Sequence, residues 1–381
     1  MELTVEPQAN ESIIQSIARI YSERRLGLND IAKNKWVNKN MSKPISEPPQ
    51  HTFILLIGDH STGKSSFINW YYQKEIQNVS VSIETSSITF ITSGAYDSTL
   101  DGQSTVDKFR ILRKIKDIQN YQNHIKTEIC LPRCQRPSLV TLIDTPGLIP
   151  DRSRLNFDLE DILISLSDYA QLILCFMDSS SQAFSPHLQS YLQKIQKFHR
   201  RKLRFFLSKA NTIINSVGRS RIVASIAQQL SNLITTSIEV KSFYIPNNNE
   251  NIEEGNEINY IVNIINNAND EMVMEAIDKL QEDVRNVTIA SEKALECIDV
   301  MRRRQMYLLM MFLILFVLYV LSYKVKGMFR KWRTKLPMTM ICVMLCVLTL
   351  MMPKNEEKKQ ILEFMKLKSK QIRMEINHFY N

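Results

Sequence analysis

The sequence predicts an α/β fold in which a parallel β-sheet is covered by helices on both faces, followed by a helical segment and two apolar segments. Three observations support this prediction. Short runs of β-branched and aromatic residues alternate with helical patterns over residues 51–270. A loop with the pattern GxxxxGK[ST] lies between the first predicted strand and the next helix. Two uncharged apolar stretches lie near the C-terminal end.

The composition indicates which kinds of partner the protein is expected to bind. The chain has 381 residues, of which 44% are hydrophobic, and a formal net charge of +9. A basic balance is typical of proteins that contact nucleic acid or an anionic membrane. Because the basic residues flank the apolar stretches, we expect a lipid bilayer and no nucleic acid. The six cysteines form no CxxC pair, so no zinc site is expected, and the polar, acidic start of the chain predicts no signal or transit peptide.

Residues 1–50 predict an N-terminal helical segment and a linker. Apolar residues recur at helical spacing between positions 9 and 40, and Pro44, Pro48 and Pro49 then mark the linker. Two interpretations remain open for the helical part. It is either a solvated arm or a helix that packs against a later helical segment.

The strongest local pattern is the loop that follows the predicted strand from Phe53 to Ile57. Glycines allow the loop backbone to aim its N–H groups at phosphate oxygens, and the following helix directs its positive dipole end toward the same anion. Lys64 is expected to reach the β- and γ-phosphates, and Ser65 to offer its hydroxyl to Mg²⁺. The loop therefore predicts a nucleotide-binding site made by nine consecutive residues: Gly58, Asp59, His60, Ser61, Thr62, Gly63, Lys64, Ser65 and Ser66.

Two later segments are expected to complete the phosphate end of this site. The Ser/Thr-rich segment 79–94 places Thr85 where a switch threonine would contact Mg²⁺ and close over the γ-phosphate, with Thr89 and Thr92 as competitors. The segment SLVTLIDTPGLI predicts a buried strand that ends in Asp144, a ligand for Mg²⁺, and in Gly147, whose N–H can contact the γ-phosphate.

The base end of the site is expected after two further strands, which begin near residues 171 and 203. The second strand leads into Ser208-Lys209-Ala210-Asn211, which occupies the place of a base-reading [N/T]KxD motif. The stem of Lys209 can lie along the base. Asn211 stands where the motif has Asp, and an amide oxygen accepts only one of the two guanine N–H groups that a carboxylate accepts. A preference for guanine is therefore expected to be weakened. A last strand is expected at residues 242–245.

The motifs GDHSTGKSS, DTPGL and SKAN, at these spacings, resemble the dynamin superfamily of GTPases, and within it the EH-domain-protein and sarcalumenin branch. The resemblance covers roughly residues 51–270. It implies a Ras-like P-loop NTPase core, hydrolysis of GTP with Mg²⁺, a nucleotide-dependent homodimer and an action on membranes. EH-domain proteins keep the Asp of the base motif and yet bind ATP, so ATP remains an alternative substrate.

The resemblance also assigns roles to individual residues. His60 and Ser61 fall at positions that cover the γ-phosphate and compensate charge. The roles that it implies are catalytic for His60, Ser61, Lys64, Thr85 and Gly147, metal-binding for Ser65, Thr85 and Asp144, and base-contacting for Lys209 and Asn211.

The C-terminal part of the chain is expected to attach the nucleotide domain to a membrane. Residues 271–305 show uninterrupted helical spacing and predict a neck, with a single helix lying on the core as the alternative. Residues 306–323 and 336–352 predict two transmembrane segments, joined by a basic connector at 324–335. Residues 353–381 predict a basic amphipathic tail that lies on anionic lipid, with a solvated tail as the alternative.

This layout resembles atlastin and mitofusin at the level of architecture. It predicts an integral membrane protein, in the endoplasmic reticulum or another endomembrane, with the GTPase domain and both chain ends in the cytosol. The expected outcome is membrane tethering, fusion or remodelling. An ATPase of the EH-domain-protein type and a nucleotide-gated scaffold with little turnover remain the alternatives.

Overall fold

A computed structural model describes residues 9–77, 87–114, 121–133, 136–147, 159–178, 184–213, 215–234, 238–246, 255–325 and 355–380. The chain divides into two compact units. The first unit comprises residues 1–12 and 49–274, and the second comprises residues 13–48 and 275–381. The long helix α9 (Ile258–Val325) contributes to both units.

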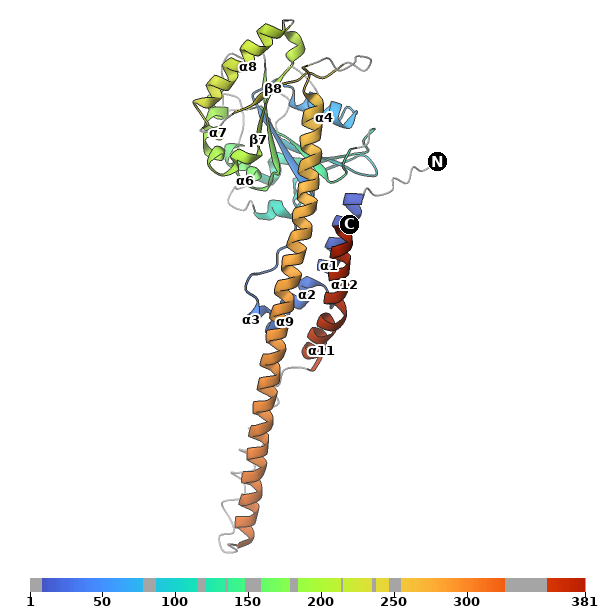
Figure 1. Ribbon diagram of the computed structural model, residues 1–381, viewed down its shortest axis with the longest axis vertical. Helices are drawn as coiled ribbons and strands as arrows, with labels where there is room; N and C mark the ends of the chain where they lie inside the picture. Colours follow the sequence, from blue (N-terminus) through green and yellow to red (C-terminus); the bar gives the residue numbers. More distant parts are fainter. Residues whose placement is uncertain are drawn as a thin grey trace, which may run out of the picture. The chain divides into compact units, whose positions relative to one another are not determined.

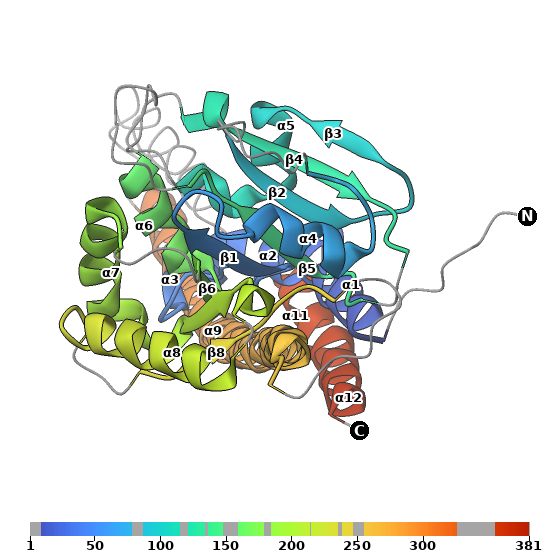
Figure 2. The ribbon, with the colours of Figure 1, turned by 90° about the horizontal axis from the view of Figure 1, so that it is seen from above.

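The first unit is built on an eight-stranded sheet with the strand order β3-β4-β2-β5-β1-β6-β7-β8. Figure 2 shows this order running from β3 at one edge to β8 at the other. The strands are β1 (Thr52–Gly58), β2 (Ile88–Ser93), β3 (Ser98–Leu100), β4 (Ile125–Cys130), β5 (Val140–Asp144), β6 (Leu172–Asp178), β7 (Leu203–Ser208) and β8 (Val240–Ser242). The predicted α/β core is confirmed, and the last predicted strand lies a few residues earlier than expected.

The sheet is mixed, which corrects the expectation of a wholly parallel one. Strands β5, β1, β6, β7 and β8 are parallel to one another, whereas β2 is antiparallel to β5 and β3 is antiparallel to β4. Antiparallel neighbours need no helical crossover between them, so alternation of strands and helices cannot reveal this pairing.

Side chains of β1 alternate between two hydrophobic layers, as expected for a central strand that is buried on both faces. Leu55 packs in the layer that includes side chains of α5, α6, α7 and α8, and Leu56 packs in the layer that includes α4 and the first turns of α9. The helices are α4 (Lys64–Tyr72), α5 (Gly102–Lys108), α6 (Leu159–Tyr169), α7 (Pro186–His199) and α8 (Ser216–Ser231). Short 3₁₀ turns are η1 (Arg110–Lys114), η2 (Tyr121–His124), η4 (Arg200–Lys202) and η5 (Ala210–Thr212).

The second unit is a helical assembly of residues 13–48, the later part of α9 and the C-terminal helices. Figure 1 shows α1, α11 and α12 alongside this part of α9. The Tyr21 hydroxyl donates a hydrogen bond to Asp283 at 2.7 Å, and Lys368 forms an ion pair with Glu23 at 2.5 Å. The other elements are α1 (Ala9–Ser22), α2 (Leu28–Lys33), α3 (Lys35–Asn40), α11 (Asn355–Glu363), the π-helical turn η6 (Phe364–Lys368) and α12 (Ser369–Phe379).

The N-terminal segment therefore packs against a later helix, which was one of its two interpretations. It forms three helices, because the chain turns between α1 and α2, where Arg25 has a φ of 73°. Residues 271–305 are helical and lie within α9, which begins already at Ile258.

The C-terminal tail is helical and amphipathic, but its apolar side chains pack inside the second unit and not on lipid. Ile361, Phe364 and Ile372 have no exposed surface, and Ile376 is 2% exposed. Lys358 pairs with Asp299 of α9, so the tail returns to the helix that precedes the apolar region.

Within the described residues, no helix combines the length and the hydropathy that crossing a bilayer requires. The predicted transmembrane segment at 306–323 is therefore not supported, and these residues continue α9. The predicted segment at 336–352 and all but the first two residues of the connector at 324–335 lie outside the described residues.

Candidate nucleotide-binding site

The predicted phosphate-binding loop connects the end of β1 to the start of α4. At Gly58 a Cβ atom would lie 2.2 Å from the carbonyl oxygen of Phe176, so this position requires glycine. Ser61 has a φ of 59°, in the left-handed region that non-glycine residues rarely adopt. Backbone strain of this kind persists where the surrounding structure fixes the conformation, and it clusters at functional sites.

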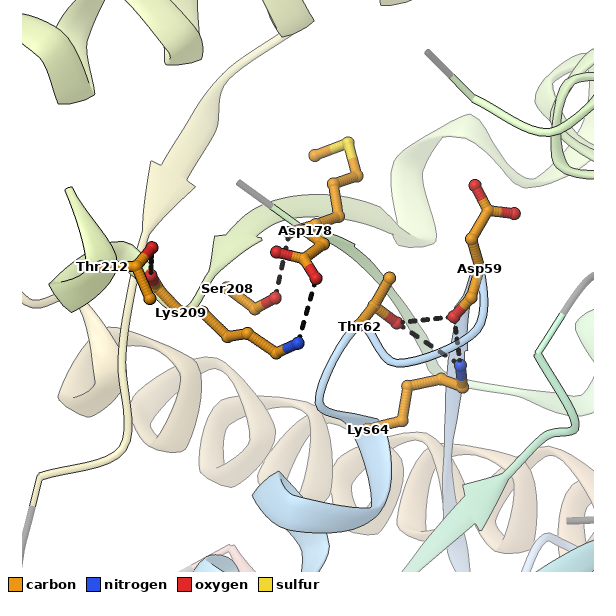
Figure 3. Close-up of polar contacts among 8 residues, drawn as sticks. Asp59, Thr62, Lys64, Asp178, Ser208, Lys209 and Thr212 are labelled. Atoms are coloured by element: carbon orange, nitrogen blue, oxygen red, sulfur yellow. Dashed lines mark hydrogen bonds and ion pairs between the residues drawn. The ribbon is translucent and has the colours of Figure 1, made fainter. Parts of the chain in front are cut away.

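Lys64 is buried inside this loop. Its ammonium donates to the carbonyl oxygen of Gly58 at 3.1 Å. It also donates to the carbonyl oxygen of Asp59 at 2.9 Å and lies 3.4 Å from the Thr62 hydroxyl (Figure 3). Burial lowers the pKa of Lys64, and the nearby charges of Asp144 and Asp59 oppose this shift. The hydrogen-bond partners of the ammonium are thus neutral oxygens, which a phosphate oxygen can replace with a stronger, charge-assisted bond.

Asp144 and Ser65 form the centre of the candidate metal site. The Ser65 hydroxyl donates to Oδ2 of Asp144 at 2.7 Å, and the carboxylate is completely buried at the end of β5. Burial raises its pKa, against the opposing effects of Lys64 and Ser65. Oδ1 is buried and has no hydrogen-bond partner among the described residues. A buried carboxylate oxygen without a donor, beside a hydroxyl, fits the oxygen ligands that Mg²⁺ prefers.

Of the two competitors of Thr85, the structure places Thr89 beside this centre. Thr89 lies directly opposite Asp144 in the antiparallel pair of β2 and β5, and its buried hydroxyl has no partner in the described part of the chain. The hydroxyl of Thr92 instead accepts a hydrogen bond from Thr141 at 3.2 Å. Thr85 lies outside the described residues, so its predicted contact with Mg²⁺ stays a prediction.

Gly147 lies against the backbone of the phosphate-binding loop. A Cβ atom at this position would come within 2.6 Å of the Cα atom of His60 and 2.8 Å of its backbone nitrogen. The neighbouring Thr145 hydroxyl donates to the carbonyl oxygen of Leu56 at 2.7 Å, which holds the start of this segment on β1. The structure thus brings the two predicted phosphate-contacting segments together.

Replacing Gly147 with alanine should lower nucleotide turnover at least about tenfold. The new methyl group cannot fit beside His60, so the segment after Asp144 must move away from the loop, and a displacement of about 1 Å at a reacting centre has effects of this size. Steady-state hydrolysis measures the effect. Gly218→Ala is the matched control, because its nearest neighbour would lie 3.4 Å from the new atom. Equal rates for the two variants would contradict a role for the close contact at Gly147.

Asp59 belongs to the predicted phosphate-binding loop, but its side chain has a partner outside the loop. The Asp59 carboxylate accepts hydrogen bonds from the backbone nitrogen of Ser185 at 3.1 Å and from its hydroxyl at 2.5 Å, so this side chain is directed to the start of α7. Only the carbonyl oxygen of Asp59 takes part in the lysine contact. His60 is half-buried and Ser61 is exposed, and Ser66 is half-buried within α4. The catalytic roles of His60 and Ser61 stay predictions.

At the base end, the structure adds a carboxylate that the sequence analysis did not identify. Lys209 forms an ion pair with Asp178 at 3.0 Å, at the ends of the adjacent strands β7 and β6 (Figure 3). Lys209 has a φ of 54°, and its carbonyl oxygen accepts a hydrogen bond from Thr212 at 2.8 Å. Asn211 is exposed in the turn that follows. The signal for Asp178 was its position directly after the last apolar residue of a predicted strand.

Comparisons with known proteins agree with this geometry. A model described as the Dynamin family matches residues 54–210. EH domain-containing protein 1 of Homo sapiens is 22% identical over 251 residues, an alignment that covers 63% of this chain and 45% of that protein. EH domain-containing protein 3 of Rattus norvegicus is 21% identical over 248 residues with the same coverage. The chain thus spans less than half the length of these curated relatives.

Solved structures show more distant similarity. An oligomerised bacterial dynamin pair aligns with 84% of this chain and 52% of its own chain, with 12% identity and a TM-score of 0.47. Era from Aquifex aeolicus aligns with 57% of this chain and 56% of its own, with 12% identity and a TM-score of 0.33.

Proposed function

We propose that this chain is a member of the dynamin superfamily and a membrane-associated enzyme that binds and hydrolyses GTP with Mg²⁺. The observation that carries this proposal is the pair of Ser65 and Asp144 beside Lys64, with one buried carboxylate oxygen left unpaired among the described residues. Lys64 and Ser65 lie at the end of the phosphate-binding loop, whose conformation requires a glycine at position 58, and Asp144 lies beside them.

Catalysis of phosphoryl transfer depends mainly on positioning and on neutralising charge. Bound Mg²⁺ would supply part of that neutralisation, and Ser65 and Asp144 are the residues that would hold it. Lys64 would exchange its contacts with the loop carbonyl oxygens for contacts with the β- and γ-phosphates. The Gly147 segment lies against the loop at His60, so it can respond to the γ-phosphate. We expect this response to control pairing of two molecules through their nucleotide faces.

The membrane part of the proposal rests on the far end of α9. Large apolar side chains are exposed there, and three arginines precede them: Arg302, Arg303 and Arg304. Tyr307 is 74% exposed, Leu313 is 64% exposed and Ile314 is 56% exposed. An exposed apolar surface of this extent indicates a lipid or protein partner, and the basic flank favours anionic lipid.

The ion pair between the tail and α9 supports an arrangement in which the segments before and after the apolar region lie on the same side of the membrane. Asp299 precedes the exposed apolar residues, Lys358 follows the apolar region, and the two form an ion pair. We therefore propose that the chain leaves the helical unit toward the membrane and returns on the same side. In this arrangement the nucleotide domain and the tail both face the cytosol, at an endomembrane.

Nucleotide preference tests the enzymatic proposal. The full chain should bind and hydrolyse GTP in the presence of Mg²⁺, with and without lipid vesicles. Preferred hydrolysis of ATP would support the alternative of an EH-domain-protein-like ATPase, and tight binding without turnover would support a nucleotide-gated scaffold.

The variant Asn211→Asp should raise the affinity for GTP relative to ATP about tenfold to a hundredfold, because a carboxylate can accept both guanine N–H groups in a charge-assisted pair. Titrations of the variant and the unmodified chain with both nucleotides measure the ratio. Thr212→Ser, which keeps the hydroxyl of the adjacent turn residue, is the control. An unchanged ratio in the aspartate variant would show that residue 211 does not face the base.

A further inference from the structure

The C-terminal end of α7 presents an aromatic side chain to solvent. Leu188, Tyr191, Leu192 and Ile195 form the buried face of this helix. Phe198 continues this face by its spacing, yet it is 83% exposed. A single exposed apolar side chain is common on protein surfaces, so the residues around Phe198 decide what it can bind.

Three exposed cations surround this aromatic residue. Lys197, Arg200 and Arg201 are exposed, and no ion pair of theirs is seen among the residues that the structure describes. We call Lys197, Phe198, Arg200 and Arg201 the α7 basic surface. Its charge is therefore available to an anionic partner.

Neighbouring residues hold this surface in place. His199 contacts Asp168 of α6 at 2.9 Å. The Lys202 ammonium donates to the carbonyl oxygens of Ser167 at 3.3 Å and Asp168 at 3.1 Å, at the end of α6. These contacts fix the backbone of the turn on both sides of Arg200 and Arg201. The surface is thus presented by a braced turn and not by a loose loop.

A cavity of about 430 Å³ adjoins this turn and shares Arg200 with it. Arg204 also lines the cavity and donates to the carbonyl oxygens of Arg201 and Leu203 at 2.8 Å, and Phe205 and Tyr260 contribute apolar walls. Lys241 also lines the cavity and is paired with Glu239 at 3.1 Å. The cavity therefore combines the cations of Arg200 and Arg204 with apolar walls, and it can accept an anionic group with an apolar neighbour.

We propose that the α7 basic surface docks onto a membrane that contains anionic lipid. An aromatic side chain flanked by cations is the combination that enters the boundary between lipid headgroups and acyl chains. The four residues lie along one helix end, without the alternating donors and acceptors that would select a particular protein segment. Charge attraction to a leaflet with anionic headgroups requires no such pattern.

This contact would be separate from the nucleotide site and from the apolar end of α9. Ser185, which caps the start of α7, donates to Asp59 of the phosphate-binding loop, and Phe198 lies at the other end of the helix. A helix of 14 residues is about 20 Å long, so the surface leaves the nucleotide site accessible. The chain would therefore carry a second lipid-binding surface, on the nucleotide-binding unit itself.

A two-vesicle capture assay on the full chain tests this inference. Donor vesicles of neutral lipid hold the full chain through a C-terminal histidine tag on chelating lipid, so that attachment does not depend on the apolar region. Acceptor vesicles contain either neutral lipid alone or about one third phosphatidylserine, a composition that gives a strongly negative surface. The test variant is Phe198→Ser with Arg200→Glu and Arg201→Glu. The control variant is Tyr96→Ser with Arg113→Glu and Arg221→Glu, which removes another exposed aromatic side chain and makes the same change in net charge.

The unmodified chain and the control variant should capture phosphatidylserine vesicles, and the test variant should capture at least about tenfold less. Each basic residue near an anionic leaflet strengthens binding about fivefold, and the test variant reverses the charge of two of them. Equal capture of neutral and phosphatidylserine vesicles would overturn the proposal. Equal capture by the test and control variants would also overturn it, and would leave an acidic protein segment as the partner of this surface. GTP turnover of the same preparations reports separately on the proposed function, because none of the substituted residues belongs to the nucleotide site.

Discussion

Replacing Lys64 with alanine is expected to lower nucleotide affinity at least about a hundredfold. The ammonium would donate charge-assisted hydrogen bonds to two phosphate groups, and each such bond is worth about 1.5–3 kcal/mol. In the structure this ammonium contacts the carbonyl oxygens of Gly58 and Asp59 and the hydroxyl of Thr62, and no carboxylate among the described residues is paired with it directly. Titration with a fluorescent nucleotide, for both GTP and ATP, measures the loss.

The matched control is Lys74→Ala. Lys74 follows the same helix and pairs with Asp97 at 2.5 Å on the surface, so its removal should leave nucleotide affinity within a factor of about two. Thermal unfolding of both variants establishes whether the fold is retained. An affinity for Lys64→Ala equal to that of the unmodified chain would remove the assignment of residues 58–66 as the phosphate-binding loop.

Replacing Phe364 with alanine is expected to destabilise the helical unit by about 3–5 kcal/mol, the usual range for the loss of a fully buried aromatic side chain. Phe364 has no exposed surface and begins the π-helical turn between α11 and α12. Its removal leaves a cavity at the point where the tail packs. Hydrogen exchange of α1, α12 and the later part of α9 measures the change, which should appear in all three because the tail forms ion pairs with Asp299 of α9 and with Glu23, the residue after α1.

Leu367→Ala in the same turn is the control for this prediction. Leu367 is 67% exposed, so its truncation should change the free energy of unfolding by less than about 0.5 kcal/mol. Nucleotide affinity should be unaffected in both variants, because the phosphate-binding loop belongs to the other unit. Unchanged exchange in Phe364→Ala would mean that the tail does not pack on the helical unit in solution, and would restore the interpretation of a lipid-bound or solvated tail.

The chemistry of the phosphate end could be predicted from the sequence because it is encoded locally. A strand, a glycine turn, Lys64 and the first turn of a helix are consecutive, and their backbone geometry follows from the residue types at these positions. Asp144 could be added because a carboxylate at the end of a buried strand faces the ligand edge of an α/β sheet. The structure places Ser65 and Asp144 in hydrogen-bond contact, as this reasoning expects.

The pairing of segments that are distant in sequence was decided only by the tertiary structure. Lys209 and Asp178 are 31 residues apart and become partners because β6 and β7 are adjacent and in register. Thr89 faces Asp144 because β2 is antiparallel to β5, a direction that no local pattern specifies. The amphipathic tail shows the same limit most clearly. A periodic apolar pattern determines that one face of a helix must be covered, but the pattern is the same whether lipid or protein covers that face. Here Phe364 and Ile372 are buried, in a tail that forms ion pairs with Asp299 of α9 and with Glu23.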